Sequence, residues 1–562
     1  MLPMSPDESK TDLYRQLQRI WGAVDSLESP PTGHNLPASE NSPTIIRSPL
    51  HPIVDASAGR VTAIQRTPTS EISSGYHQDI PRNVVPGGQH RSIEGVEVAA
   101  GKIVDCFHLF FAYYSPQVPV VERPASLDAI YDICPLLFWT IVVIGSRKYD
   151  EDATMFDQLS PKILDLAFQS LKSSQSPVQI VQALVLLCAW PLPSRHLYQD
   201  KVHTLAGACM QLALQLGLHV AGVGQDFARE QVQAQATEQS FRALLWRYCV
   251  MICHSASISD GLPPSMLVEG FQPDWAEYDN NAITPTSLAV RTKLHHIQSS
   301  AICKIVAHLM ATPEDRSLEA LIDIFDSQAR MMLSQLHDEM GEQNKFKSTT
   351  RWPDAVTDIL TQNCVRLHIC VSRFMQYDSA STIGLVDVYG IALRLIEKFS
   401  ALNASTNIAS HSTFYLYRSL GLAAFVILRL CRSPVELVID RERGKRCYFI
   451  AIQLLRTRIV EEVDLDSKLA TILTDLWSSS LVFRTREGVV DSLLVRVKSR
   501  LTMNVFFDSL WWWRQEFLGQ PDPFTSVNQP SSQAANAFVG FAETFNYDEN
   551  YFGMYDNTLP YA

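Results

Sequence analysis

The sequence predicts an all-α protein: one large multi-helix domain, preceded by a short coiled coil and a linker and followed by a tail. Two observations predict this fold class. Apolar residues recur at steps of three and four along most of residues 93–520, which is the spacing of a helix face, and alternating strand patterns are nearly absent. In addition, 46% of the 562 residues are hydrophobic, which is enough to bury more than one domain of ordinary size.

Residues 1–28 predict a short coiled coil that dimerises the chain. Within "DLYRQLQRIWGAVDSL" (12–27), apolar residues follow one another at gaps of four, three, four and three. This is the a/d repeat with which one helix packs along another. Two heptads are marginal on their own, so the helix needs a partner. The predicted dimerisation residues are Leu13, Leu17, Ile20, Val24 and Leu27.

Residues 29–92 predict a disordered linker. The segment is rich in Pro, Ser, Thr and Gly and poor in aromatic residues. Such a composition cannot bury enough apolar surface to offset the loss of backbone entropy on folding.

Residues 93–520 predict the helical domain. Four of its helices are expected over residues 178–190, 200–220, 238–261 and 492–517, where apolar residues repeat at helical steps. Gly217 suits the C-terminal end of the second of these helices, because glycine adopts the left-handed conformation at no steric cost.

Residues 521–562 predict an acidic, aromatic tail. No Lys or Arg follows Arg514, and aromatic side chains alternate with acids. Acids keep aromatic groups solvated, so the composition is typical of a disordered activation segment that docks on the transcription machinery. The alternative is a tail that packs back on its own domain. The aromatic residues concerned are Phe538, Phe541, Phe545, Tyr547, Tyr551 and Phe552.

The charge argues against a nucleic-acid binder that acts on its own. The net charge is −12, and phosphate neutralisation needs clustered Lys and Arg. The nearest basic block is "RERGKR" (441–446), which we interpret as a solvated helix end or turn rather than a nuclear-import signal.

Eleven scattered cysteines, none in a C-x-x-C pair, indicate reduced thiols in an intracellular protein. Cys249 and Cys253 lie one helical turn apart and are metal-ligand candidates. Because two further ligands are not apparent nearby, we interpret them as core thiols. The longest apolar run, residues 136–146, is too short to span a bilayer, so no membrane association is expected.

No catalytic motif is apparent, so neither an enzyme nor a bound cofactor is expected. The sequence contains no G-x-S-x-G, no H-E-x-x-H and no phosphate-binding loop. The acidic stretch 148–157 could suggest the magnesium-diphosphate site of an all-α terpene cyclase. It has no second metal motif and is expected to form a solvated loop.

Five stretches, taken in order, resemble the regulatory region of the fungal zinc-cluster (Zn2Cys6) transcription factors. They are "FHLFFAYYSPQVPVV" (107–121), "CPLLFWTIVVIGSRKY" (134–149), "VQIVQALVLLCAWPLP" with "DKVHTLAGACMQLALQLGLHV" (178–220), "RALLWRYCVMICHSASISDGLPP" (242–264) and "SRLTMNVFFDSLWWWRQEF" (499–517). The last stretch is similar to the subgroup that includes the leucine-biosynthesis and weak-acid-response activators.

This resemblance implies a nuclear RNA polymerase II activator of a metabolic or secondary-metabolite gene set. The family's DNA-binding head is a six-cysteine, two-zinc cluster, but the first cysteine here is Cys106. Zinc is therefore expected only in a head missing from this chain, and DNA binding only through that head or a partner. We expect a fragment or a truncated gene prediction. The alternative is a head-less interaction protein that dimerises with a full-length factor and modulates it.

Polar residues within the apolar stretches are the candidate site residues. Arg147, Arg242 and Arg514 are expected to tie helices together as buried ion pairs, and His219 to cap helix carbonyls near Trp246. The sharper hypothesis is that these residues bind a small acidic metabolite, since the planar guanidinium suits carboxylates.

Overall fold

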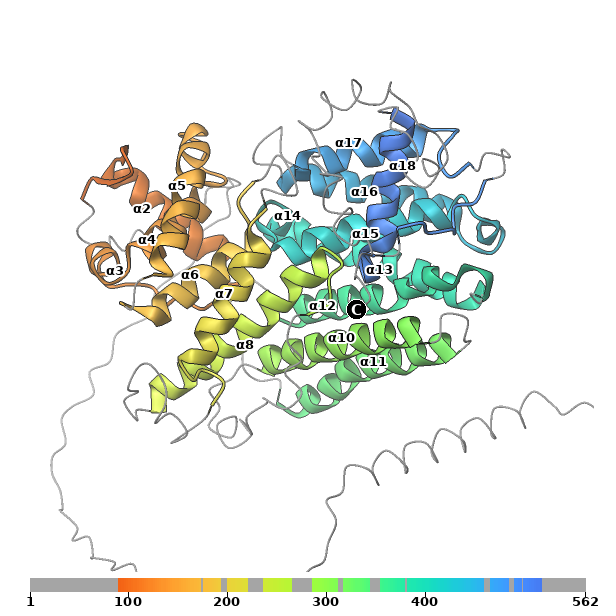
Figure 1. Ribbon diagram of the computed structural model, residues 1–562, viewed down its shortest axis with the longest axis horizontal. Helices are drawn as coiled ribbons and strands as arrows, with labels where there is room; N and C mark the ends of the chain where they lie inside the picture. Colours follow the sequence, from red (N-terminus) through yellow and green to blue (C-terminus); the bar gives the residue numbers. More distant parts are fainter. Residues whose placement is uncertain are drawn as a thin grey trace, which may run out of the picture. The chain divides into compact units, whose positions relative to one another are not determined.

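The computed structural model describes residues 89–172, 175–193, 200–220, 236–264, 286–311, 317–343, 354–379, 382–458, 465–484, 490–497 and 499–517. The predicted coiled coil, nearly all of the predicted linker and the predicted tail lie outside these residues. The described part is helical apart from connecting segments, a short hairpin and one isolated bridge, so the all-α prediction is confirmed (Figure 1).

The first core is built from residues of the N-terminal half. A hairpin of β1 (Arg91–Ile93) and β2 (Val96–Val98) leads into α2 (Ala100–Leu109), which continues as the π-helix η1 (Phe110–Tyr114). Six more helices follow: α3 (Leu127–Ile133), α4 (Pro135–Ser146), α5 (Thr154–Ser170), α6 (Pro177–Ala189), α7 (Val202–Gln215) and the longest of them, α8 (Ala236–Ser259). Eleven of the twelve residues of α4 are buried, so it is the central helix of this group.

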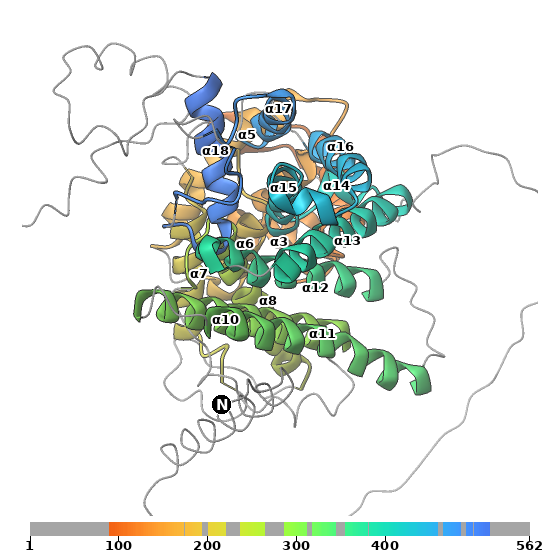
Figure 2. The same cartoon turned by 90° about the vertical axis from the view of Figure 1, so that its right-hand side faces the viewer.

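The second core is built from the remaining elements. These are α10 (Thr286–Ala311), α11 (Ser317–Gln343), α12 (Asp354–Cys370), η3 (Val371–Ser379), α13 (Thr382–Thr406), α14 (Ile408–His411), α15 (Phe414–Leu430), η4 (Pro434–Val438), α16 (Arg441–Arg458), α17 (Leu465–Ser478), η5 (Leu501–Met503) and α18 (Asn504–Phe517). Figure 2 shows α10 and α11 in one layer, α12 and α13 in the next, and α15 and α16 beyond them. All 17 residues of α15 are buried, which makes it the centre of this core.

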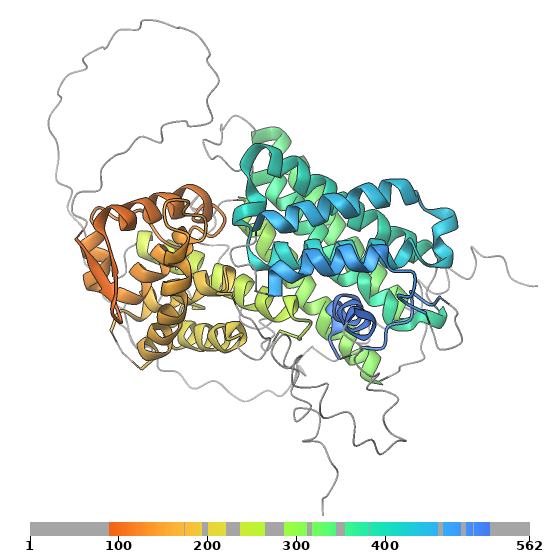
Figure 3. The same cartoon turned by 90° about the horizontal axis from the view of Figure 1, so that it is seen from above.

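The two cores meet along α8, α10 and α15. Helix α8 packs with α6 and α7 of the first core and also contacts α10 and α15 of the second (Figure 3). A second contact lies at α14, where Gln117 and Trp190 of the first core both donate hydrogen bonds to the backbone carbonyl of His411, at 2.8 and 2.9 Å. The cores therefore share both apolar and polar contacts.

Three predicted helices match the structure closely. The ranges 178–190, 200–220 and 238–261 correspond to α6, α7 and α8. Gly217 has a φ of 66° directly after α7, as its predicted place at the helix end requires.

The prediction of one helix over residues 492–517 is wrong in its N-terminal part, because α18 begins only at Asn504. Arg429 donates hydrogen bonds to the carbonyls of Ser492 and Leu494, and the backbone N–H groups of Arg496 and Val497 donate to the carboxylate of Asp508. These tertiary partners replace the hydrogen bonds that a helix would make.

Candidate functional site

A layer of polar residues, most of them buried, lies where the two cores meet, and we call it the junction layer. Its members come from α7 and α8 of the first core and from α10, α12, α15 and the η5 region of the second. They are Asp200, His203, His254, Asp260, His295, Gln298, Ser299, His368, Tyr415, Arg418, Ser419, Arg500 and Thr502. Since a buried polar group without a partner costs free energy, the members of such a layer are expected to bond to one another.

His368, on α12, belongs to this layer and is fully buried. Its Nε2 lies 3.0 Å from Ser419 Oγ, and the Ser419 hydroxyl donates its only proton to the carbonyl of Tyr415 at 2.8 Å. His368 Nε2 must therefore carry the proton, which leaves Nδ1 to accept from Thr502 Oγ1 at 3.5 Å. Burial lowers the pKa of His368 to about 3, so the ring is neutral at physiological pH.

Tyr415 joins His368 to the helix α10. Its ring stacks on His368 with centroids 5.5 Å apart, and its hydroxyl donates to Gln298 Oε1 at 3.1 Å. The ring of Tyr415 also contacts His295, whose pKa burial likewise lowers to about 3. A further hydrogen bond of 3.1 Å joins His254 of α8 to Ser299 of α10. His295 and His368 are thus neutral, and the hydrogen bonds of His254 and His368 link neighbouring helices.

Asp260 directly follows α8 and carries the negative charge of the layer. His203 donates to its Oδ2 at 2.6 Å, and Arg500 of the second core donates to its backbone carbonyl at 3.2 Å. Burial alone would raise the pKa of Asp260, but the hydrogen bond from His203 and the charges of Arg418 and Arg500 outweigh burial and lower it. Asp260 is therefore ionised, and its Oδ1 is buried without a hydrogen-bond partner among the described residues.

The turn at Gly261 lets the two cores approach at this point. Gly261 has a φ of 69°, and a Cβ there would lie only 2.1 Å from the carbonyl oxygen of Arg500. A side chain at this position would push the chain after α8 away from the second core.

Arg418 and Asp200 complete the charged part of the layer. The guanidinium of Arg418 is buried over the rings of Phe414 and Phe506, 4.8 and 5.2 Å from their centroids, and its Nε has no hydrogen-bond partner in the described part of the chain. Burial and the nearby charge of Asp260 raise the pKa of Asp200 to about 6. The layer therefore holds a buried cation and a second carboxyl group that is neutral in mild acid.

The candidate residues predicted from sequence lie at three separate places. Arg147 ends α4 and donates to the carbonyl of Pro191 at 2.9 Å. Arg242 donates to the carbonyl of Leu216 at 2.6 Å, at the end of α7. His219 and Trp246 lie at the same place, with ring centroids 5.7 Å apart.

Arg514 lies on α18 in the second core. The structure thus brings Arg242, His219 and Trp246 together, but places Arg147 and Arg514 on other elements. The hydrogen bonds of Arg147 and Arg242 given above go to backbone carbonyls at helix ends, which is a helix-tying role.

Sequence reasoning missed Arg418, Arg500 and Asp260. One signal was available for Arg418: it interrupts "FYLYRSLGLAAFVILRL", and an arginine inside so apolar a helix must lie beside other polar groups. Asp260 and Arg500 lie 240 residues apart in the sequence, and nothing local connects them.

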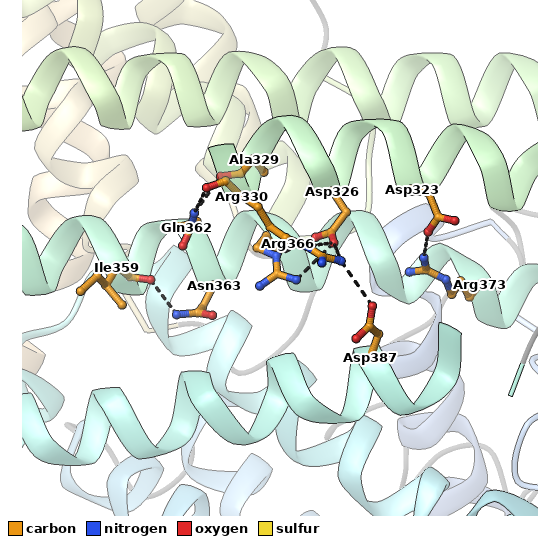
Figure 4. A network of polar contacts seen from close by, with 10 residues as sticks. All are labelled: Asp323, Asp326, Ala329, Arg330, Ile359, Gln362, Asn363, Arg366, Arg373 and Asp387. Atoms are coloured by element: carbon orange, nitrogen blue, oxygen red, sulfur yellow. Dashed lines mark hydrogen bonds and ion pairs between the residues drawn. The ribbon is translucent and has the colours of Figure 1, made fainter. Parts of the chain in front are cut away.

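A second polar network ties α11, α12 and α13 together (Figure 4). Asp326 of α11 is buried and accepts from Arg366 at 2.7 Å and from Arg330, which also reaches Asp387 of α13 at 3.3 Å. Burial alone would raise the pKa of Asp326, but the hydrogen bonds from both arginines outweigh burial and lower it. Arg373 pairs with Asp323 nearby. All these charges have partners, so we assign this network to helix packing.

Among the described residues, one group of potential metal ligands lies close together, and its members are cysteines. The interpretation of Cys249 and Cys253 as core thiols did not foresee Cys209, whose sulfur lies with theirs in one cluster. Among the described helices, none is long and apolar enough to cross a membrane.

Residues 107–339 match the fungal specific transcription factor domain. Transcriptional regulatory protein SEF1 of Candida albicans is 23% identical over 498 residues, covering 84% of this chain and 51% of the relative. Regulatory protein LEU3 of Saccharomyces cerevisiae is 22% identical over 473 residues, covering 75% of this chain and 52% of the relative. A Kluyveromyces lactis relative that carries the name SEF1 is 23% identical over 524 residues, covering 91% of this chain and 43% of the relative.

The chain thus spans about half the length of the curated relatives that it matches. No solved structure matches it.

Proposed function

We propose that this chain, which carries a fungal specific transcription factor domain, is a transcriptional regulator of the fungal zinc-cluster type. The observation that carries the proposal is the domain match over residues 107–339, together with alignments to named regulators that extend across both cores. The regulator acts in the nucleus. Its activity is binding rather than catalysis.

The junction layer is proposed as the place where a signal is sensed. Asp260 is a buried anion at the end of the first core, and the cations that face it, Arg418 and Arg500, belong to the second. A small acidic metabolite carries negative charge, as Asp260 does. By engaging these arginines it would compete with Asp260 and change how the two cores are held together.

The remaining segments are proposed to supply the partners. Residues 13–27 dimerise the chain with itself or with a related factor, and the tail recruits the transcription machinery. DNA is reached through a zinc-cluster head outside this chain or through a partner. These proposals follow from the sequence patterns and the resemblance.

A tethering assay tests the regulatory activity. The full chain, fused to an unrelated bacterial DNA-binding domain, should change transcription of a reporter with the matching operator at least several-fold over the DNA-binding domain alone. A second fusion that lacks residues 518–562 should lose activation. An unchanged reporter with both fusions would overturn the proposal.

Thermal unfolding tests the metabolite proposal. Succinate, malate and citrate are each added to the purified chain. We expect at least one of them to raise the melting temperature, and Arg418→Gln to abolish that rise. Arg443→Gln is the matched control, because Arg443 is an exposed arginine in the second core. A rise that Arg418→Gln leaves intact, or none with any of the three acids, would contradict the metabolite proposal.

A further inference from the structure

Three cysteine thiols meet inside the first core. Cys209 lies on α7, and Cys249 and Cys253 lie one turn apart on α8. Their three sulfur atoms lie within 4.8 Å of one another, and the sulfurs of Cys209 and Cys249 are 3.5 Å apart. The exposed fractions are 0% for Cys209 and Cys249 and 5% for Cys253, so all three residues of the cluster are buried.

The spacing of the sulfurs suits one three-coordinate centre. With bonds of about 2.3 Å to sulfur, as in metal thiolates, three ligands around one atom lie at most about 4.0 Å apart. The sulfurs need to move by less than about 1 Å to reach that arrangement. Cys249 and Cys253 are already on the same face of one helix, since residues four apart are neighbours.

The surroundings decide which charge such a centre can have. The three cysteines belong to the apolar core, and the polar groups that act most strongly on each thiol are the other two thiols. Three thiolates carry three negative charges. A divalent ion would leave one of them uncompensated and a monovalent ion would leave two, and burying an uncompensated charge is costly. A trivalent centre leaves the complex neutral.

We propose that Cys209, Cys249 and Cys253 bind a trivalent thiophilic element, arsenite or antimonite, as a neutral tris-thiolate. With arsenous acid, As(OH)₃, three As–S bonds form and three As–O bonds break. Each thiol proton leaves with one hydroxide as water, so arsenic stays trivalent and no oxidant or reductant is needed. The bound element cross-links α7 to α8, because one ligand comes from α7 and two from α8.

The test uses the reduced, full-length chain and sodium arsenite. Native mass spectrometry should show one tightly bound arsenic accompanied by the loss of three hydrogens. X-ray absorption at the arsenic edge should show three sulfur neighbours and no oxygen. This measurement is made on the unmodified chain, so it does not depend on whether a variant folds.

Two variants then locate the site. Cys249→Ala should weaken arsenite binding at least tenfold, because only two sulfurs remain. Cys303→Ala, which changes a partly buried cysteine on α10, should leave binding unchanged. The proposal is overturned if arsenite does not bind, if the bound arsenic has fewer than three sulfur neighbours, or if Cys249→Ala binds it as tightly as the unmodified chain. It is also overturned if Zn²⁺ displaces arsenite from the site.

Discussion

Arg429 and Asp508 are both fully buried. Their side chains form an ion pair with each other and hydrogen bonds with the chain around them. Arg429 also donates to Ser509 and to the carbonyls of Ser492 and Leu494. A buried ion pair is stable only when its remaining polar atoms have partners. Here they do, so the pair fixes residues 490–497 between α15 and α18.

Removing the charge of Asp508 should therefore be costly. We expect Asp508→Asn to lower the free energy of unfolding by about 3–5 kcal/mol, since the guanidinium of Arg429 would stay buried without its counter-charge. Arg443→Ala, which breaks the exposed pair of Arg443 with Glu397, should cost less than about 1 kcal/mol. Urea unfolding of the two variants measures both values, and similar losses would contradict this account.

Asp200 should make the stability depend on pH in a defined direction. Burial and the charge of Asp260 raise its pKa to about 6, against about 3.9 in the unfolded chain. Between these values the folded state binds more protons, so the Asp200 carboxyl lowers stability as the pH rises from about 4 to about 6.

The variant Asp200→Asn has no such proton to lose. We expect it to match the unmodified chain near pH 4 and to exceed it by roughly 1–3 kcal/mol above pH 6, at about 1.4 kcal/mol per pKa unit. Melting curves at the two pH values give the difference. Asp165→Asn, at an exposed position of α5, is the matched control. A gain in stability from Asp200→Asn that does not grow with pH would refute the assignment.

Among the helices, the crossing of α2 and α4 depends on Gly145. A Cβ at this position would lie 2.1 Å from the carbonyl oxygen of Cys106, so the two helices approach backbone to backbone. Gly207 on α7 is exposed and has nothing within 4 Å of its Cβ position, which makes it a matched control.

The two glycines should therefore respond to alanine in opposite directions. Gly145→Ala forces α2 away from α4 and should cost about 1–3 kcal/mol, the range for overpacking a core. Gly207→Ala improves helix propensity and should add up to about 1 kcal/mol. Thermal unfolding of both variants compares them, and a neutral Gly145→Ala would show that the crossing is looser than described.

Local signals account for the helices that the sequence predicted well. Pro191 and Pro193 follow α6, and Gly217 and Gly261 follow α7 and α8 with positive φ, so each boundary is marked by a residue beside it. The part of residues 492–517 that precedes α18 has no such mark, because the backbone carbonyls of Ser492 and Leu494 bond to Arg429, more than 60 residues earlier.

The candidate site was less accessible to sequence reasoning for the same reason. The helix-end positions of Arg147 and His219 followed from local patterns. The junction layer depends on how α8, α10, α12 and α15 pack, and the thiol cluster depends on α7 facing α8. The residue type alone does not distinguish Arg418 from Arg147 and Arg242, which donate hydrogen bonds to carbonyls at helix ends.

For the whole molecule, self-association is predicted from residues 12–27 alone. Leu17→Lys combined with Val24→Lys places charges on the a/d seam and should raise the dissociation constant of the dimer at least tenfold. Sedimentation of the full chain measures this, with Gln18→Lys, off the seam, as control. A monomer before mutation, or a dimer that the double variant leaves intact, would show that the heptads do not dimerise the chain.

The central claim is that this chain regulates transcription, and promoter occupancy in its own cell tests it most directly. The chain is tagged at its chromosomal locus, crosslinked to chromatin and immunoprecipitated, and transcripts are compared with and without the gene. We predict enrichment at a defined set of promoters, reached directly or through a partner, and altered transcription of those same genes when the chain is absent. Enrichment no greater than in an untagged strain, with unchanged transcripts, would contradict the claim.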